Sequence, residues 1–219
     1  MALTPQKKAI PSGLSEAEAI ERAKQGDAES LEGLYRLHDQ QPEPASSVAE
    51  GTNDRIFLVG FMGAGKTTVG RALAEKLHWQ FIDLDEEIVR QEHRAIAEIF
   101  RLHGEVYFRR LESATLRLVL KTTPPPLVLA AGGGAYVHPG NAELLRRSGF
   151  LAVFLDASVE ELRRRCAGGG AERPLARDEN LFRQLYEARR SAYMAAEMRI
   201  DTGGKTPEQV VEEVLGFRR

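Results

Sequence analysis

The apolar positions of the chain follow two alternating patterns from residue 55 onward. Short runs such as 127–131 and 150–155 are apolar at every position, which is typical of strands covered on both faces. Between them, apolar residues recur three or four positions apart, which predicts helices. We predict strands at 55–60, 80–83, 127–131, 150–155 and 198–201, and helices within 84–101 and at 66–77, 104–121, 141–148, 159–166, 178–196 and 207–216.

This alternation of strands and helices predicts an α/β fold, in which a parallel sheet of about five strands is joined by right-handed crossovers. Helices would cover both faces of the sheet and give three layers. Ligands of such folds bind beyond the carboxyl ends of the strands. The residues that directly follow each strand are therefore the first candidates for chemistry.

The first 53 residues lack this alternation. Ser15 and Glu18 have the spacing of a capping box, which predicts a short helix at 16–25, and a second amphipathic helix is predicted at 28–38. Residues 40–53 contain two prolines and small polar residues without apolar periodicity, as in a linker. We predict a helical extension with its linker at 1–53 and a second domain at 54–219.

The predicted helices of the extension allow two interpretations. Residues 19–38 resemble the opening helices of extracytoplasmic-function sigma factors. The alternative is an amphipathic helical pair that packs on the second domain or lies loose.

Composition narrows the class of protein. A net charge of −2 over 219 residues provides no basic field for nucleic acid, and no apolar run reaches the roughly 18 residues of a membrane span. The single cysteine, Cys166, excludes an intramolecular disulfide and a cysteine-cluster metal site. With no signal-peptide pattern at the N-terminus, we expect a cytoplasmic, monomeric protein without nucleic-acid or membrane partners.

A phosphate-binding motif follows the first predicted strand. Gly60 is followed after four residues by Gly65, Lys66 and Thr67, between a strand and a helix, which is the required context of a P-loop. Its backbone N–H groups would surround phosphate oxygens, Lys66 would reach the β- and γ-phosphates, and Thr67 would bind Mg²⁺. The predicted nucleotide-binding residues are Gly63, Ala64, Gly65, Lys66, Thr67 and Thr68. The alternative is a glycine-rich turn with no ligand.

Four further clusters fall at or near predicted strand ends or helix starts, and each has a simpler interpretation. Two carboxylates could cap a helix, an Arg–Glu pair three positions apart could be a solvated surface pair, a run of glycines could be a tight turn, and a run of arginines could be a solvated helix face. The clusters are Asp83 with Asp85; Arg109 with Glu112; Gly132, Gly133 and Gly134; and Arg163 to Arg165 followed by glycines 168–170 and Arg173.

Taken together and in this order, the clusters resemble those of shikimate kinases, which belong to the nucleoside-monophosphate-kinase-like P-loop group. The resemblance extends over residues 55–216 and includes the P-loop, Phe-Ile-Asp-Leu-Asp at 81–85, the triple glycine and Arg-Pro-Leu at 173–175. It implies a three-layer P-loop kinase fold with a mobile lid.

The resemblance also implies roles for individual residues. Lys66 and Thr67 would bind phosphate and Mg²⁺, and Asp83 would support the metal. Asp85 would hold the shikimate hydroxyls and orient the attacking one, and Arg173 would reach the transferring phosphate from the lid. Lys66, Asp85 and Arg173 are therefore the implied catalytic residues. Arg165 would pack on adenine.

The shikimate side of the predicted site contains Arg109, the glycines 132–134 and a second arginine. Arg189 is preferred to Arg190 for this second carboxylate-binding role, because it lies four residues before Tyr193, the spacing of the family, although Ser191 and Ala192 stand where the family usually has Pro-Leu. Paired arginines bind a carboxylate better than lysines would.

The implied reaction is transfer of the γ-phosphate of ATP to the 3-hydroxyl of shikimate, with Mg²⁺ as cofactor, in aromatic amino-acid biosynthesis. Two other functions stay open: a related module that senses a ligand without catalysis, and a kinase of another small hydroxy acid such as gluconate.

Overall fold

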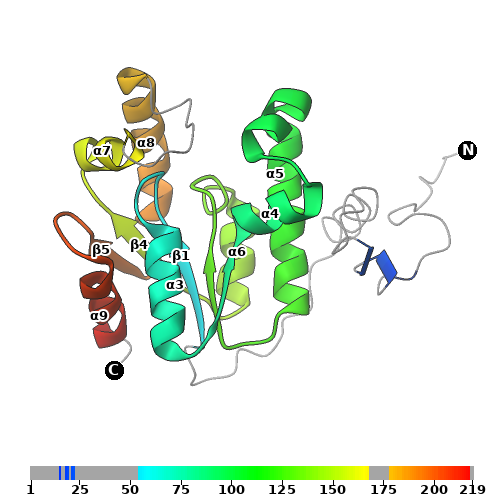
Figure 1. Cartoon of the computed structure of the whole chain (residues 1–219), viewed down its shortest axis with the longest axis horizontal. Coiled ribbons are helices and arrows are strands. Elements are labelled where there is room, and N and C mark those ends of the chain that lie inside the picture. Colours follow the sequence, from blue (N-terminus) through cyan, green and yellow to red (C-terminus); the bar gives the residue numbers. More distant parts are fainter. Residues whose placement is uncertain (1–14, 16–17, 20, 23–53, 168–177, 218–219) are drawn as a thin grey trace, which may run out of the picture. The chain divides into compact units, whose positions relative to one another are not determined.

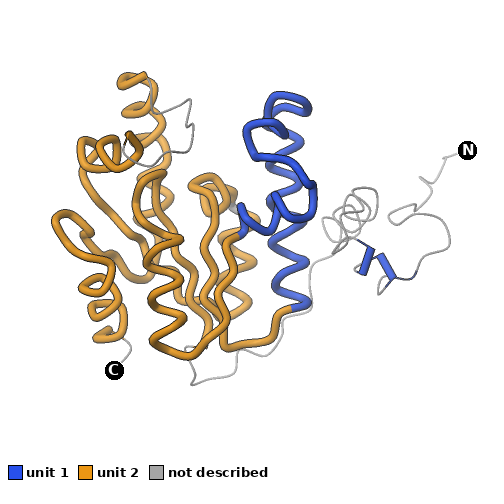
Figure 2. Tube along the Cα trace, in the orientation of Figure 1, with its two compact units in different colours: residues 1–45, 84–122 blue, residues 46–83, 123–219 orange. Residues whose placement is uncertain are grey.

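The computed structural model describes residues 15, 18, 19, 21, 22, 54–167 and 178–217. They fall into two compact units, shown in Figure 2. One unit contains residues 84–122 together with the few described residues near the N-terminus, and the other contains residues 54–83 and 123–217. The predicted boundary at 53 and 54 adjoins residues outside the described ranges.

The larger unit is built on a parallel sheet of five strands in the order β2-β3-β1-β4-β5. The strands are β1 (Arg55–Val59), β2 (Gln80–Asp83), β3 (Leu127–Ala130), β4 (Leu151–Asp156) and β5 (Met198–Asp201). Every residue of β3 and β4 is buried, as their continuous apolar runs predicted. The predicted five-stranded parallel sheet is confirmed.

Helices of this unit lie on both faces of the sheet. The chain crosses through α3 (Lys66–Leu77) in one direction along the sheet, and through α6 (Pro139–Arg147) in the other, so right-handed crossovers place α3 and α6 on opposite faces. α9 (Pro207–Phe217) packs against α3. α7 (Val159–Ala167) and α8 (Glu179–Tyr193) follow β4, near the end of the sheet that also presents the loops after β1 and β3 (Figure 1).

The smaller unit consists mainly of α4 (Leu84–Glu92) and α5 (Ile96–Thr122). α5 is interrupted at Gly104, where φ is 77° and ψ is 176°, so the predicted break between two helices is present. The rings of Phe100 and Phe108 meet across this break, with centroids 4.4 Å apart. Thr115 of α5 donates a hydrogen bond to the buried side chain of Gln91 on α4, at 3.3 Å.

Several predicted bounds were wrong by a few residues. The predicted helix at 141–148 begins at Pro139, since proline is favoured in the first turn of a helix. The predicted helix at 178–196 ends at Tyr193, where residues 194–196 form tight turns instead. The strand predicted at 127–131 ends at Ala130, where the glycine loop begins.

The predicted capping box is confirmed. The backbone N–H of Ser15 donates to the Glu18 carboxylate at 2.8 Å, and that of Glu18 donates to the Ser15 hydroxyl at 3.3 Å. The rest of the helical extension, its linker and the resemblance to sigma factors fall almost entirely outside the described residues.

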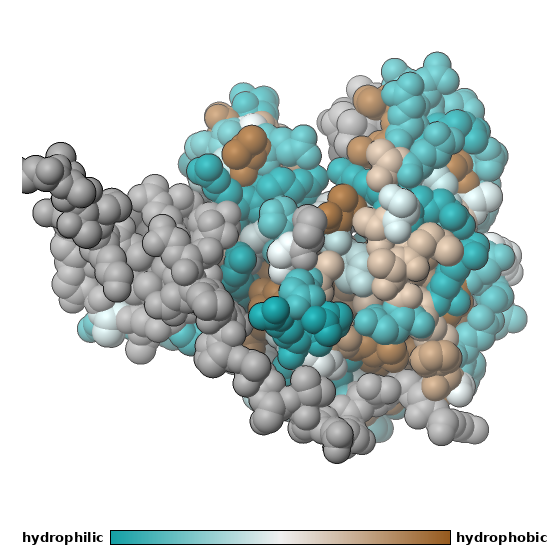
Figure 3. All heavy atoms as spheres, turned by 180° about the vertical axis from the view of Figure 1, so that it is seen from behind, coloured by the Kyte–Doolittle hydropathy of each residue, from teal (hydrophilic) through white to brown (hydrophobic). Residues whose placement is uncertain are grey.

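None of the helices in the described part of the chain has the length and hydropathy that crossing a bilayer requires. On the face shown in Figure 3, hydrophilic residues surround smaller hydrophobic areas.

Candidate active site

The loop between β1 and α3 requires glycine at position 63. Gly63 has a φ of 82°, and a Cβ atom there would lie 2.6 Å from the carbonyl oxygen of Leu162 and 2.9 Å from the sulfur of Cys166. α7, which contains Leu162 and Cys166, therefore packs in close contact with the loop. Ala64, the next residue, is buried.

This loop leads into a helix start that suits an anion. Gly65, the N-cap residue of α3, supplies no side-chain hydrogen bond, and the first turn contains no acidic residue, so the positive end of the helix dipole is not neutralised from within. The Lys66 ammonium donates to the carbonyls of Gly60 and Phe61, at 2.9 and 3.0 Å. The positive charge is thus held at the loop itself. Thr68, in the first turn of the helix, is exposed.

Thr67 and Asp83 come together at the carboxyl end of the sheet. The Thr67 hydroxyl donates to the carboxylate of Asp83, the last residue of β2, at 2.6 Å, and Asp83 is 9% exposed. Both are oxygen donors of the kind Mg²⁺ prefers. No group of three or more His, Cys, Asp or Glu side chains that could hold a metal forms among the described residues. A metal ion held here would take its other ligands from phosphate and water.

The glycine loop after β3 lies beside Arg189. A Cβ atom on Gly133 would be 3.3 Å from the Gly60 carbonyl oxygen and 3.5 Å from Nη1 of Arg189. The hydroxyl of Tyr193 donates to the Gly133 carbonyl. The predicted phosphate loop, the glycine loop and an arginine of α8 therefore meet in one place.

Phe61 joins this arrangement from the phosphate loop. Its ring packs edge-to-face on Phe182 and Tyr186 of α8, with centroids 5.0 and 5.5 Å away. The guanidinium of Arg189 lies over the Phe61 ring, 6.0 Å from its centre. The phosphate loop, through Phe61, and Arg189 of α8 are thus both in contact with the same aromatic cluster.

Two further predicted residues belong to the smaller unit. Asp85 lies in the first turn of α4 and is partly buried. Arg109 of α5 donates to Glu112 at 2.8 Å and is paired with Glu105 at 3.3 Å. Glu112 is only 1% exposed, so the pair is not the solvated surface pair that its spacing alone allowed. Burial opposes the charge of Arg109, but the two carboxylates outweigh it and raise the pKa of the guanidinium.

Comparison with known proteins decides the family. A family model described as shikimate kinase matches residues 62–218.

The chain belongs to the shikimate kinase family.

Among similar proteins, the shikimate kinase of Persephonella marina is 40% identical over 161 residues, which cover 74% of this chain and 96% of that protein. The one from Geobacter sulfurreducens is 43% identical over 174 residues, covering 78% and 93%. The structure of Acinetobacter baumannii shikimate kinase in complex with shikimate aligns with a TM-score of 0.69 at 37% identity, covering 74% of this chain and 91% of that one.

Within this shikimate kinase fold, the two neighbouring arginines of α8 have different surroundings. Arg190 is paired with the buried carboxylate of Asp156 at 3.0 Å and donates to the Tyr186 hydroxyl at 3.1 Å. The Tyr186 hydrogen bond and the charge of Asp156 raise the pKa of Arg190. Arg190 is therefore engaged in the packing of α8, whereas Arg189 lies beside the glycine loop.

The last arginines of the predicted site fall in different parts of the chain. Arg165 lies on α7 and contacts Glu161 and Thr202. Arg173 lies outside the described residues, as does the predicted lid segment.

Sequence reasoning named Glu112 and Tyr193 without their contacts, and it missed Thr202. The burial of Glu112 could not be read from its spacing to Arg109. The Tyr193 hydrogen bond to Gly133 depends on how α8 meets the loop after β3. Thr202 directly follows β5, and its place after a strand was the signal that could have identified it.

Proposed function

We propose that this chain is a magnesium-dependent kinase that transfers the γ-phosphate of ATP to the 3-hydroxyl of shikimate. The observation that supports this best is the meeting of Arg189, Gly133 and Gly60. In this arrangement the guanidinium of Arg189, which could bind the carboxylate of the acceptor, lies beside the loop that would hold the nucleotide phosphates. The relatives named as shikimate kinases support the choice of acceptor.

The nucleotide phosphates would be held by the P-loop. The uncapped start of α3 and the ammonium of Lys66 supply positive charge where phosphate oxygens would lie. Phosphoryl transfer depends mainly on positioning and charge neutralisation, and these groups provide both. Lys66 would exchange its loop carbonyls for phosphate oxygens as the nucleotide binds.

Thr67 and Asp83 would hold Mg²⁺, since their oxygen atoms are already together. A bound Mg²⁺ would neutralise charge on the phosphate oxygens. Asp83 sits at the end of a strand and is largely buried, so its position is set by the sheet rather than by a flexible loop.

The acceptor would be held by Arg109, Arg189 and the glycine loop. Arginines bind a carboxylate through two parallel hydrogen bonds, which fixes its orientation as well as its position. Gly132, Gly133 and Gly134 would allow the backbone to approach the hydroxylated ring of shikimate closely. Asp85 would accept a hydrogen bond from the attacking hydroxyl and orient it toward the γ-phosphate.

The remaining assignments rest on sequence more than on structure. Arg173 would reach the phosphate in transfer, and Arg165 would pack on the adenine ring. We also propose that the protein acts as a monomer in the cytoplasm, a reducing compartment that its single cysteine fits.

The test is an assay of ADP release with MgATP and shikimate, run beside gluconate and a mixture without acceptor. We expect turnover that depends on shikimate and on Mg²⁺, and little above background with gluconate. Faster turnover with gluconate would assign a different hydroxy acid. Binding of shikimate and ATP without turnover would identify a ligand-sensing module instead.

A further inference from the structure

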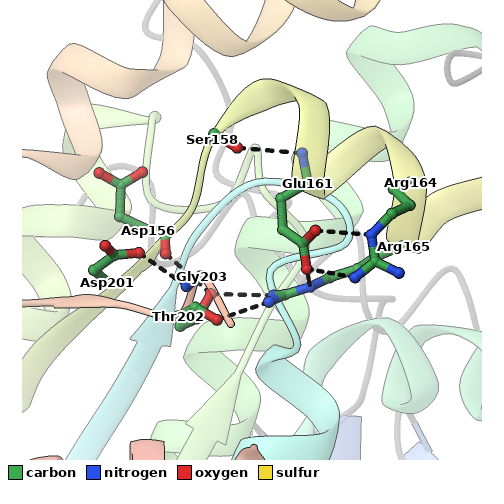
Figure 4. Close-up of polar contacts among 8 residues, drawn as sticks. All are labelled: Asp156, Ser158, Glu161, Arg164, Arg165, Asp201, Thr202 and Gly203. Atoms are coloured by element: carbon green, nitrogen blue, oxygen red, sulfur yellow. Dashed lines mark hydrogen bonds and ion pairs between the residues drawn. The ribbon is translucent and has the colours of Figure 1, made fainter. Parts of the chain in front are cut away.

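The guanidinium of Arg165 donates hydrogen bonds from three of its nitrogen atoms, all along its edge. Its Nε donates to the Glu161 carboxylate at 2.8 Å, its Nη1 to the Thr202 hydroxyl at 3.1 Å, and its Nη2 to the Thr202 carbonyl at 2.7 Å (Figure 4). All N–H groups of a guanidinium lie in its plane. These three contacts therefore fix the plane of the group and use neither of its flat faces.

Glu161, the partner of Arg165 on α7, is held by hydrogen bonds of its own. The Glu161 backbone N–H donates to the Ser158 hydroxyl at 3.3 Å, at the start of the helix. Its carboxylate also accepts hydrogen bonds from Arg164, at 2.8 and 2.7 Å. The hydrogen bonds from Arg164 and Arg165 lower the pKa of Glu161 to about 2, so this carboxylate is charged at neutral pH.

The partner after β5 is anchored to the neighbouring strand. Thr202 is only 2% exposed, and both its backbone N–H and its hydroxyl donate to the carbonyl of Asp156, at 2.7 and 3.0 Å. The Thr202 hydroxyl thus donates to the end of β4 and accepts from Arg165. Its orientation is determined by the sheet.

We propose that Glu161 and Thr202 are positioning residues, which together hold the guanidinium of Arg165 so that one flat face receives the adenine ring. This inference rests on the nucleotide-binding role of Arg165 in the proposed function. A guanidinium stacks on a planar aromatic ring through its face, and loose rotation of the side chain would weaken that contact. Neither positioning residue contacts the nucleotide in this arrangement.

A purely structural role for Glu161 and Thr202 predicts different behaviour. Loss of a structural link between α7 and the residue after β5 would affect all ligands and lower stability. Loss of Arg165 orientation would affect only the part of nucleotide binding that depends on the base. The experiment therefore compares ADP with inorganic tripolyphosphate, which has the phosphates but no base.

The variants are Arg165→Met, Glu161→Ala and Thr202→Val in the full chain, and binding of both probes is measured by calorimetry. For all three we expect ADP affinity to fall about three- to tenfold, from the size of a cation–π contact. Tripolyphosphate affinity and the KM for shikimate should stay unchanged, and the KM for ATP should rise while kcat stays the same.

Two further variants provide matched controls. Arg164→Met removes the other, solvent-exposed partner of Glu161 and should leave ADP affinity unchanged. Thr202→Ser keeps the hydroxyl and should restore the affinity lost in Thr202→Val. Melting temperatures show whether each variant folds, and Glu161→Ala, on a helix surface, serves if Thr202→Val does not.

The outcomes separate this inference from the function on which it rests. If Arg165→Met weakens ADP binding but Glu161→Ala and Thr202→Val do not, the positioning role is wrong and the nucleotide role stands. If Arg165→Met leaves ADP binding unchanged, Arg165 has no base to receive and both assignments fall, although turnover with shikimate still tests the kinase function by itself. Equal loss of ADP and tripolyphosphate binding in Glu161→Ala would show a structural role and overturn the proposal.

Discussion

The hydroxyl of Tyr193 donates a hydrogen bond to the carbonyl of Gly133, which lies 60 positions earlier in the chain. This bond joins the end of α8 to the glycine loop after β3, one turn of helix from Arg189. Tyr193 is fully buried and its ring packs on Phe154 of β4, at a centroid distance of 5.4 Å. The ring thus fixes the hydroxyl, and the hydroxyl fixes the loop.

Tyr193→Phe should loosen the glycine loop without disturbing the aromatic packing. We expect the KM for shikimate to rise about three- to tenfold, from the loss of one hydrogen bond, with the KM for ATP unchanged. Tyr186→Phe makes the same chemical change on the same helix but away from the loop, and should leave the shikimate KM as it is. A rise in both variants would mean that general loosening of α8 is responsible.

Gly133→Ala should nearly abolish activity. The new methyl group would lie 2.8 Å from the Tyr193 hydroxyl oxygen and 3.3 Å from the Gly60 carbonyl oxygen, so either the glycine loop or the phosphate loop must shift. Gly216→Ala in α9, where no atom lies within 4 Å, is the control and should raise stability by about 0.5–1 kcal/mol. Steady-state kinetics and thermal unfolding measure the two effects. Near-normal kinetics in Gly133→Ala would show that the loop is not closely packed in solution.

Arg189→Met and Arg190→Met should separate binding from stability. Removing Arg189 should raise the shikimate KM about ten- to hundredfold, since hydrogen bonds between charged groups are lost. Removing Arg190 should instead lower the free energy of unfolding by about 0.5–1.5 kcal/mol, because the buried Asp156 loses one charged partner and keeps another, Arg199. Kinetics and urea unfolding of both variants check this, and the reverse pattern would exchange the two assignments.

Asp85→Asn tests the acceptor side of the proposed reaction. We expect kcat to fall at least about a hundredfold, because the amide cannot orient the attacking hydroxyl as the carboxylate does. ADP binding, measured by calorimetry, should stay close to wild type. Lys66→Met should instead weaken ADP binding. Turnover by Asp85→Asn near the wild-type rate would contradict the orienting role.

The stability of the protein should fall at alkaline pH partly through Tyr186. Burial raises the pKa of its hydroxyl, and the nearby charge of Asp156 adds to the effect, while the hydrogen bond from Arg190 opposes it. Above the ordinary tyrosine pKa of about 10, the unfolded chain therefore loses this proton more readily than the folded one, and stability falls as pH rises. Below that pH the Tyr186 hydroxyl is protonated in both states, and its full contribution to the stability of the folded protein is present.

Urea unfolding of wild type and Tyr186→Phe between about pH 9 and 11 measures this dependence. The variant should show a shallower fall, although not a flat one, because burial also raises the pKa of Tyr136. Identical slopes in the two proteins would exclude Tyr186 as a source.

Sequence predicted the sheet well because every strand of its centre is a continuous apolar run between helical patterns. The P-loop could be predicted equally well, because Gly65, Lys66 and Thr67 are consecutive and lie between a predicted strand and a predicted helix. The sheet and the P-loop need only periodicity and local context. The place of Asp83 beside Thr67 was instead implied by the resemblance to shikimate kinases, because two carboxylates at the end of a strand could equally cap the next helix.

Other parts of the site depend on contacts between distant segments. Arg189 and Arg190 are adjacent, and only the rotation of α8 directs one to the glycine loop and the other to Asp156. Glu112 is buried because of how α5 packs, which spacing within a helix does not determine. Thr202 is an ordinary residue after a strand until Arg165 is seen to donate to it.

The strand order also has a consequence for how the protein loses function as it opens. β1 is the central strand, paired on both sides and buried at four of its five positions, so its amide hydrogens should exchange with solvent only when the whole sheet unfolds. β2 and β5 are the edge strands, and Asp83 and Thr202 lie at their ends. Fraying of β2 would therefore release the proposed Mg²⁺ contact of Asp83 first, and fraying of β5 would release the Thr202 contact that orients Arg165 toward adenine. The phosphate loop would keep its conformation until global unfolding.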